Sequence, residues 1–295
     1  MKPSIGLIGV GLMGHGIALN ILKNGYRLTL LAHPGNQPVD DLLSSGAIAK
    51  VSARDVAQQS DIVILCVTGS PEVEDVMTNA QGVLKGLRAG ATVIDCSTAL
   101  PESTIRMASL VDDAHGQFLD APMTRTAQHA REGRLNLLVG GTKEDLARVL
   151  PLLRCFAENV THAGAVGAGH ALKLLHNFVS LGSAALIAEA VACAAKGGVD
   201  PRVFVDALAT GGGAGIALDR LKPFILGRDS SGLQFYMSNA LKDIQYYANM
   251  AGALDAAHAI GDAVADTYRE GVTRAGGHAM VPELVSALES ASSAG

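Results

Sequence analysis

The first half of the chain alternates between short apolar runs and helix-compatible segments, and this alternation strongly constrains the fold. Apolar runs of strand length occur at 4–10, 27–32, 61–67, 91–97, 117–122 and 135–141. Helix-compatible segments lie between most of them, at 12–24, 38–45, 53–58, 71–78, 102–112 and 143–156. Continuous apolar strands separated by helices are typical of a mostly parallel sheet covered on both faces. The short spacing between 117 and 141 predicts a local departure from strict alternation.

The second half is predicted to be helical throughout. Helical stretches follow one another at 168–196, 201–210, 214–226, 237–252, 254–273 and 280–290. Between the first two, Asp200 and Pro201 provide an N-cap and a first helical residue. We therefore predict a doubly wound α/β domain over 1–164 and an all-helical domain over 165–295, joined by one long interdomain helix.

Composition narrows the class of protein. The 295 residues can build two sizeable cores, and a hydrophobic content of 48% indicates a globular chain. The formal charge of −5 argues against nucleic acid or an anionic membrane as partner. The run from Phe178 to Ala195 has the length of a membrane span, but Glu189 and many small residues favour a packed soluble helix. The glycine-spaced N-terminus likewise argues against a secretory leader.

Cysteine and histidine usage points to a reducing compartment and no metal. Cys66, Cys96, Cys155 and Cys193 form no C-x-x-C pair, which argues against a disulfide framework or a zinc site. The nine histidines show no metal-ligand spacing with acidic partners. We expect a cytoplasmic protein without a metal.

The motif G-x-G-x-x-G at 9–14 lies between a predicted strand and a predicted helix, the context of a Rossmann dinucleotide site. Gly9 would allow the tight turn, Gly11 a close backbone approach to a pyrophosphate, and Gly14 close helix–strand packing. Leu12 and Met13, between these glycines, are expected beside the cofactor. The positive end of the helix would face the phosphates. A purely structural turn is the alternative.

The end of the second predicted strand bears on the choice between NAD and NADP. Ala32 stands where an acidic residue would bind the adenine ribose diol. His33 and Asn36 could hydrogen-bond a 2′-phosphate, although no arginine is present to clamp one. These residues favour NADP over NAD. The alternative is a simple turn, with NAD held by backbone contacts.

Four motifs occur in order along nearly the whole chain: "GLIGVGLMG", "DCST", "DAPMTRTAQHAREGRLNLLVGG" and "GAGHALKLLHN". Together they resemble the β-hydroxyacid dehydrogenases, the family that includes 3-hydroxyisobutyrate dehydrogenase and tartronate semialdehyde reductase. The "KD" pair at 242–243 is similar to a further family motif. The resemblance implies reversible hydride transfer between a nicotinamide cofactor and a small 3-hydroxy acid or its semialdehyde.

The resemblance implies a catalytic role for Lys173 and a substrate-contacting role for Asn177. Residues i and i+4 share one face of a helix, so the ammonium and the amide can face one cleft. A lysine there can protonate a carbonyl oxygen, accept the proton in reverse and stabilise alkoxide charge. A lysine that reaches solvent or pairs with a carboxylate is the alternative. His176 is another conceivable acid, but a packed histidine is the favoured interpretation.

The resemblance also places further residues near the nicotinamide. Ser97 and Thr98 correspond to a family pair that lies close to it; helix capping is the alternative. Val67 and Thr68 stand where the family has Leu-Pro, so the resemblance leaves open whether these two residues contact the nicotinamide. Lys242 resembles a family lysine at the rim of the cleft, near cofactor and substrate, and Asp243 is expected to have a structural role. The alternative is that the two residues form an ion pair at the surface.

The predicted substrate loop departs from the family pattern D-A-P-V-S-G-G. Here Thr124, Arg125 and Thr126 replace Ser-Gly-Gly. Thr124 keeps a hydroxyl, and Arg125 adds a planar set of donors suited to an oxyanion. The last two residues are similar to the loop of sulfolactaldehyde reductase, a family member with a sulfonate substrate. We expect a short acidic aldehyde or hydroxy acid; an outward Arg125 paired with a surface acid is the alternative.

Two other functions share this architecture. An imine reductase is disfavoured because such enzymes commonly carry another residue at position 173. A non-catalytic cofactor-binding regulator is disfavoured because it has no need of the Lys173–Asn177 pair. The alanine- and glycine-rich helical domain, together with the resemblance, predicts a homodimer or homotetramer.

Overall fold

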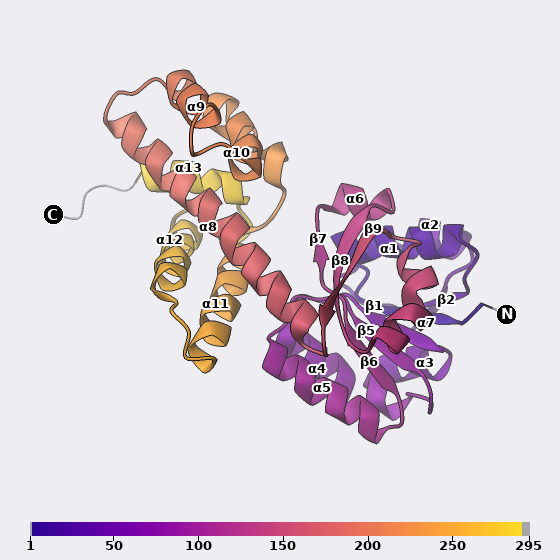
Figure 1. The fold of residues 1–295 in the computed structure, drawn as a ribbon. Helices are drawn as coiled ribbons and strands as arrows, with labels where there is room; N and C mark the ends of the chain where they lie inside the picture. Colours follow the sequence, from indigo (N-terminus) through magenta and orange to yellow (C-terminus); the bar gives the residue numbers. More distant parts are fainter. Residues whose placement is uncertain (1, 291–295) are drawn as a thin grey trace. The chain divides into compact units, whose positions relative to one another are not determined.

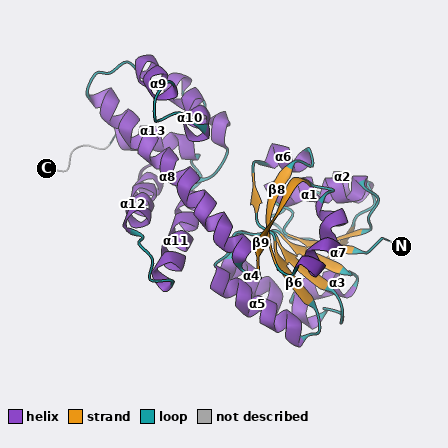
Figure 2. Ribbon diagram, in the orientation of Figure 1, coloured by secondary structure: helices purple, strands orange, loops and turns teal. Residues whose placement is uncertain are grey.

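The computed structural model describes residues 2–290, and the chain divides into two compact units after Lys173 (Figure 1). The division falls within the long helix α8, Ala168–Lys196. The predicted domain boundary at 164/165 lies just before this helix. Strands gather in the first unit, whereas the second is built from helices (Figure 2).

A mostly parallel sheet with a short antiparallel extension forms the first unit. Its strands are β1 Ile5–Ile8, β2 Leu28–Leu31, β3 Ile48–Lys50, β4 Ile62–Leu65, β5 Thr92–Asp95, β6 Gln117–Asp120, β7 Met123–Thr124, β8 Leu135–Gly140 and β9 Ala157–Gly164. They are ordered β3-β2-β1-β4-β5-β6-β8-β7, and β9 pairs with β8. The order 3-2-1-4-5-6 is that of a Rossmann sheet, which binds ligands outside the carboxyl ends of β1 and β4, where the order reverses. The predicted fold class is confirmed.

Helices cover both faces of the sheet, as its apolar strands require. They are α1 Leu12–Lys23, α2 Asp40–Ser44, α3 Ala53–Gln58, α4 Ser70–Thr78, α5 Pro101–Asp113, α6 Ala127–Arg131 and α7 Lys143–Leu153, with a 3₁₀ turn at Val83–Lys85. Alternate residues of β4 point to opposite faces of the sheet, and each face has its own hydrophobic core. Ile62 and Ile64 pack with α1 and α7, whereas Val63 and Leu65 pack with α3, α4 and α5. Burial of each such side chain contributes about 1.5–3 kcal/mol.

The strand register brings several residues to one level at the carboxyl edge of the sheet. Ile8 is paired with Leu65, Leu65 with Asp95, and Asp95 with Asp120. Paired residues of neighbouring parallel strands point to the same side. Two aspartates therefore lie side by side at this edge.

Three strands were not predicted. β3 is only three residues long and largely exposed, and β9 exposes polar side chains such as Glu158 and Asn159, so neither forms the continuous apolar run that would have revealed it. β7 is two residues long and pairs antiparallel with β8, which also pairs antiparallel with β6. The predicted irregularity between 117 and 141 is this antiparallel extension.

The second unit packs helices around the C-terminal part of α8. They are α9 Pro201–Ala209, α10 Ile216–Gly227, α11 Met237–Ala253, α12 Ala259–Ala275 and α13 Leu284–Glu289, with 3₁₀ turns at Ser230–Leu233 and Val281–Glu283. Tyr268 is fully buried and donates a hydrogen bond to the Leu181 carbonyl at 2.9 Å. Phe178 stacks on Tyr247 with ring centroids 4.0 Å apart.

Two helix boundaries in this unit differ from the prediction. The helix expected from 254 begins at Ala259, because α11 ends at Ala253 and Asp255 adopts a left-handed φ of 52°. The helix expected over 280–290 starts as the turn Val281–Glu283. The turn at Asp255 and the turn Val281–Glu283 therefore set where α12 and α13 begin.

Among the described residues, α8 is a helix whose length and mean hydropathy of 1.8 would allow it to cross a membrane. The core helix of a soluble domain has the same properties. Here Leu181, Ala184, Ala188 and Val191 contribute to the core of the second unit.

Candidate active site

The glycine loop after β1 has the geometry that its motif predicts. Gly9 has a φ of 96°, and a Cβ there would lie 2.2 Å from the Cys66 carbonyl oxygen. A Cβ on Gly14 would lie 2.0 Å from the Gly9 carbonyl oxygen. A Cβ on Gly11, by contrast, would meet no heavy atom of the described chain within 4 Å. Gly9 and Gly14 serve packing, whereas Gly11 faces open space.

This open space lies at the N-terminus of α1. Gly11 is the N-cap residue and provides no side-chain cap, and the first turn carries no acidic residue. Leu12 is 48% exposed, and Met13 is partly buried. Uncapped N–H groups and the positive end of a helix suit a phosphate. These residues therefore fit the pyrophosphate of a dinucleotide.

The end of β2 carries no acidic side chain. Ala32 and His33 are exposed, and no Asp or Glu occurs from 32 to 37. The Asn36 side chain accepts a hydrogen bond from the Val10 N–H at 3.2 Å and donates one to the Leu31 carbonyl at 2.9 Å. Asn36 therefore braces the glycine loop, and its amide is not freely available for the predicted contact with a 2′-phosphate.

The residues predicted near the nicotinamide follow β4 and β5. The Ser97 hydroxyl accepts a hydrogen bond from the Val67 N–H at 3.0 Å, so the two loops are joined. Thr68 is exposed and Thr98 half-buried. The alternative role of Ser97 and Thr98 as helix caps does not apply, because α5 starts at Pro101 with Leu100 as its N-cap residue.

A buried cluster that was not predicted lies directly behind these loops. Asp95, Asp120 and His170 are all fully buried, and the first two end neighbouring strands. The His170 ring nitrogens lie 3.9 Å from Asp95 Oδ2 and 3.8 Å from Asp120 Oδ2. Burial raises the pKa of the Asp95 carboxyl, opposed by the charge of His170 and by hydrogen bonds from Ser97. Three motifs supply these residues: "DCST", "DAPMT" and "GAGH".

Lys173 follows His170 by three residues on α8. Its side chain is 9% exposed, which is unusual for a lysine. His170 contacts the Ser97 carbonyl at 3.2 Å, so this part of α8 lies beside the carboxyl edge of the sheet. Lys173 is thus a largely buried amine at the head of an apolar helix, as its sequence context predicted, and its catalytic role stays a prediction.

Asn177 lies one turn further along α8, within the second unit. Its amide donates a hydrogen bond to Asp243 Oδ2 at 2.7 Å, and its oxygen lies 3.0 Å from His176 Nδ1. Lys242 pairs with Asp243 Oδ1 at 2.7 Å and lies 4.9 Å from the centre of the Tyr246 ring. Asp243 is 2% exposed. It therefore connects the two side chains predicted to contact substrate and cofactor.

The predicted substrate loop is held by β8 and β9. The Thr124 hydroxyl accepts a hydrogen bond from Asn136 Nδ2 at 3.1 Å, and the Thr126 hydroxyl lies 2.7 Å from His129 Nδ1. Arg125 has a left-handed φ of 81° and pairs with Glu158. This pairing corresponds to the alternative considered for Arg125, and anion binding by Arg125 stays a prediction.

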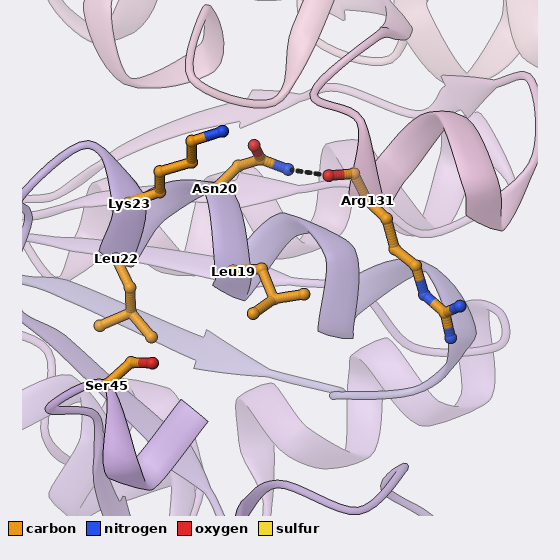
Figure 3. Close-up of a pocket in the computed structure, with 6 residues that line it drawn as sticks. All are labelled: Leu19, Asn20, Leu22, Lys23, Ser45 and Arg131. Carbon is orange, nitrogen blue, oxygen red and sulfur yellow. Dashed lines mark hydrogen bonds between the residues drawn. The ribbon is translucent and has the colours of Figure 1, made fainter. Parts of the chain in front are cut away.

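A separate pocket lies between α1, α2 and α6 (Figure 3). It is lined by Leu19, Asn20, Leu22, Lys23, Ser45 and Arg131. The Asn20 amide donates to the Arg131 carbonyl at 3.1 Å, while the Arg131 guanidinium extends away from this contact (Figure 3). This bond holds α6, which follows the substrate loop, against α1. Within residues 2–290, no group of three or more His, Cys, Asp or Glu side chains is arranged to hold a metal.

Fold and glycine loop together define a dinucleotide-binding protein with a helical second unit. Residues 4–164 match the NAD-binding domain of 6-phosphogluconate dehydrogenase, and residues 167–288 match the NAD-binding domain of NADP-dependent 3-hydroxyisobutyrate dehydrogenase. The chain therefore belongs to the β-hydroxyacid dehydrogenase family, and it is an NAD(P)-dependent oxidoreductase.

Individual relatives agree with this assignment. The chain is 34% identical over 197 residues to 2-hydroxy-3-oxopropionate reductase of Escherichia coli, covering 67% of each chain. It is 33% identical over 220 residues to NAD-dependent L-serine dehydrogenase of Pseudomonas aeruginosa, covering 75% of this chain and 74% of that protein. The structure of 3-hydroxyisobutyrate dehydrogenase from Mycobacterium tuberculosis has the same fold. Its TM-score is 0.87 at 24% identity, with 98% of this chain and 100% of that chain covered.

Proposed function

We propose that the protein interconverts a small 3-hydroxy acid and its semialdehyde, with Lys173 as the general acid and base. A nine-tenths buried lysine one turn beyond the residue that contacts Ser97 is the observation that carries this proposal. The names of the relatives, a 2-hydroxy-3-oxopropionate reductase and an L-serine dehydrogenase, support short hydroxy acids as the substrate class.

The bound cofactor would supply or accept the hydride at the carbinol carbon. In reduction, the Lys173 ammonium donates its proton to the carbonyl oxygen as the C–H bond forms and the C=O π bond breaks. In oxidation, the neutral amine takes the hydroxyl proton. Positioned proton transfer of this kind contributes about 10²–10⁴-fold to a rate. The cation also stabilises alkoxide charge as it develops.

Asn177 and Thr124 would orient the substrate. Thr124 is buried and receives its hydrogen bond from Asn136, which leaves the hydroxyl proton of Thr124 to be donated. The amide of Asn177 donates to Asp243 on α11 in the structure, and this bond fixes the orientation of the Asn177 side chain. Arg125 would bind the acidic group of the substrate if it exchanges Glu158 for that group.

For the cofactor we propose NADP. The exposed Ala32 places no negative charge near a 2′-phosphate, and His33 is exposed beside it. With no arginine between 32 and 37, the expected preference over NAD is modest.

We also propose a cytoplasmic homo-oligomer. All four cysteines are free thiols, and burial raises the pKa of the Cys66 thiol to about 12, which is consistent with a reducing compartment.

The oligomer is supported by an exposed apolar stripe. Val179 and Leu186, seven residues apart on α8, are each about two-thirds exposed at 66% and 65%. A second chain would cover such a stripe. V179D or L186D should then lower the mass measured by analytical ultracentrifugation, whereas a lone monomer in the wild type would contradict the proposal.

The deciding experiment assays hydroxy acids and semialdehydes, sulfonates included, with both nicotinamide cofactors. K173M should lower kcat by about 10²–10⁴-fold while cofactor affinity is retained. K143M, at an exposed lysine on α7, is the matched control. An unchanged kcat in K173M removes the proposed mechanism. Turnover of cyclic imines alone would indicate an imine reductase, and cofactor binding without any turnover a regulator.

A further inference from the structure

The loop after β2 supplies no fixed cation for the 2′-phosphate of NADP. Residues 32–39 contain neither lysine nor arginine, and the Asn36 amide is engaged in bonds within the chain. His33 Nδ1 accepts a hydrogen bond from the Gly35 N–H at 3.0 Å. Because a backbone N–H can only donate, Nδ1 carries no proton and the ring is neutral in this contact. A full positive charge for the phosphate must therefore come from a neighbouring element.

Lys50 is the last residue of β3, the strand beside β2. The two strands are parallel, and Lys50 is in register with Leu31. The Ala32 N–H donates a hydrogen bond to the Lys50 carbonyl at 2.7 Å. Neighbouring strands of a sheet lie about 4.8 Å apart. Lys50 therefore starts one strand away from Ala32, the position at which the adenine ribose is expected.

The Lys50 side chain lies on the face of the sheet that α3 covers. Paired residues of parallel strands point to the same side, and Leu31 packs against the core beneath α3, α4 and α5. Hydrogen bonding by Ser52 lowers the pKa of the Asp55 carboxyl, and the nearby charge of Lys50 adds to that effect. Asp55 belongs to the first turn of α3, which begins just after β3 ends. The ammonium thus lies near the carboxyl edge of the sheet.

This ammonium is available to a ligand. Among residues 2–290 it forms no hydrogen bond and no ion pair. The nearby Asp55 carboxylate is paired with Arg54 instead, at 3.3 Å. Lys50 is half-buried, so its alkyl stem packs on the protein while the charged end reaches solvent. A phosphate bound here would meet an unpaired cation.

We propose that Lys50 binds the 2′-phosphate of NADP and thereby determines the cofactor preference of the protein. This inference rests on the proposed use of NADP. The lysine would donate charge-assisted hydrogen bonds to the phosphate from β3, and His33 would donate its Nε2–H from the loop after β2. The glycine loop would bind the pyrophosphate of either cofactor. Only NADP would use the lysine.

A lysine at this place also has a purely structural explanation. β3 is the edge strand of the sheet, and lysine on an edge strand discourages pairing with another chain. That role makes no distinction between NADPH and NADH. A comparison of the two cofactors therefore separates the explanations.

Binding of the two reduced cofactors to the full-length protein tests the inference without a substrate. Isothermal titration calorimetry measures both dissociation constants in the wild type, K50M and K50R. K50M removes the charge and keeps an unbranched stem. It should raise Kd for NADPH about tenfold or more, the value of a charge-assisted hydrogen bond, and leave Kd for NADH within about twofold. K50R should retain most of the NADPH affinity.

K23M is the matched control. Lys23 is another exposed lysine, but it lies in the last turn of α1, at the opposite edge of the sheet. K23M should change neither Kd. Salt provides a second measurement, because raising it from about 0.1 to 1 M shortens the Debye length from about 10 to 3 Å. Salt should weaken NADPH binding more than NADH binding in the wild type, and both to the same extent in K50M.

The possible outcomes separate this inference from the proposed function. An unchanged Kd for NADPH in K50M overturns it, and so does an equal loss for NADH, which would place the ammonium at the shared pyrophosphate. A wild type that prefers NADH would reject the proposed cofactor, and Lys50 would keep its role only if K50M still weakened NADPH selectively. Absence of hydroxy-acid turnover would reject the proposed function and leave these binding measurements unaffected.

Discussion

Arg125 forms an ion pair with Glu158, joining the loop after β7 to the start of β9. The arginine occupies a position where the family pattern has glycine, and its φ of 81° is of the kind that glycine adopts without strain. Left-handed backbone at another residue costs about 1–2 kcal/mol. The ion pair with Glu158 offsets part of this conformational cost in the structure.

The substrate-binding role of Arg125 can be separated from this ion pair. R125G removes the guanidinium and the backbone strain together, and it should raise KM for the acidic substrate by about 10- to 100-fold, the value of a charge-assisted hydrogen bond. E158Q should lower that KM, because Glu158 no longer competes for the arginine. The hydrogen bond and charge of Arg125 lower the pKa of Glu158, so the competitor is ionised at neutral pH. If neither substitution moves KM, Arg125 serves the loop alone.

The three glycines of the motif should respond differently to alanine. In G14A, a gain of about 0.5–1 kcal/mol in helix propensity is outweighed by overpacking against the Gly9 carbonyl, which costs about 1–3 kcal/mol or more. G11A should fold normally, because its φ of −77° suits alanine and the Cβ meets open space. It should nevertheless weaken cofactor binding about tenfold or more by filling the space for the pyrophosphate. Melting temperature and cofactor titration measure the two effects. Tight cofactor binding by G11A would place the phosphates elsewhere.

Cofactor choice is expected to depend on position 32. In A32D, a carboxylate would accept hydrogen bonds from the ribose diol of NAD and repel the 2′-phosphate of NADP. The ratio of kcat/KM for NADP over NAD should fall about tenfold or more, since 1.4 kcal/mol of repulsion has that effect. A32S is the uncharged control. An unaltered ratio in A32D would mean that the ribose does not reach this position.

The stability of the first unit should depend on pH through Asp61. Its Oδ2 accepts hydrogen bonds from the Ser4 N–H and hydroxyl, each at 2.7 Å, and its other oxygen pairs with Arg88. These contacts lower the pKa of Asp61. A carboxyl whose pKa is lowered on folding stabilises the protein above its unfolded pKa and loses that contribution as the pH falls through its folded pKa.

D61N should therefore destabilise the protein at pH 7 and matter less in acid. Half of the Asp61 side chain is exposed, so solvent screening limits the loss to about 1 kcal/mol. Urea unfolding at pH 7 and below pH 4 measures the difference. A deficit of the same size at both values would assign the effect to lost hydrogen bonds rather than to the charge. D55N, at a carboxyl whose ion-pair partner Arg54 is its neighbour in the sequence, serves as the comparison for a purely local ion pair.

The hydrophobic pattern predicted most of the helices and strands but missed strands that are very short or carry polar residues. The helices at 53–58 and 168–196 have the predicted limits, because each combines a helical pattern with clear boundary signals. β3 was missed because it is only three residues long, and β9 because Glu158 and Thr161 interrupt any apolar run. In the candidate site, Lys173 and the glycine loop could be found from the motifs. The partners of Arg125 and Asn177 could not, since Glu158 and Asp243 lie 33 and 66 residues away.

The sequence alone determined the order of elements, the parallel sheet and the family, because local periodicity and glycine spacing encode them. It also marked Lys173 as a lysine at the head of an apolar helix. Only the tertiary structure placed Asp95, Asp120 and His170 together, because strand register and the start of α8 bring distant residues to one edge of the sheet. Burial there removes water, so each of these polar groups depends on its neighbours in the fold rather than on solvent, and that requirement exists only once the chain has folded.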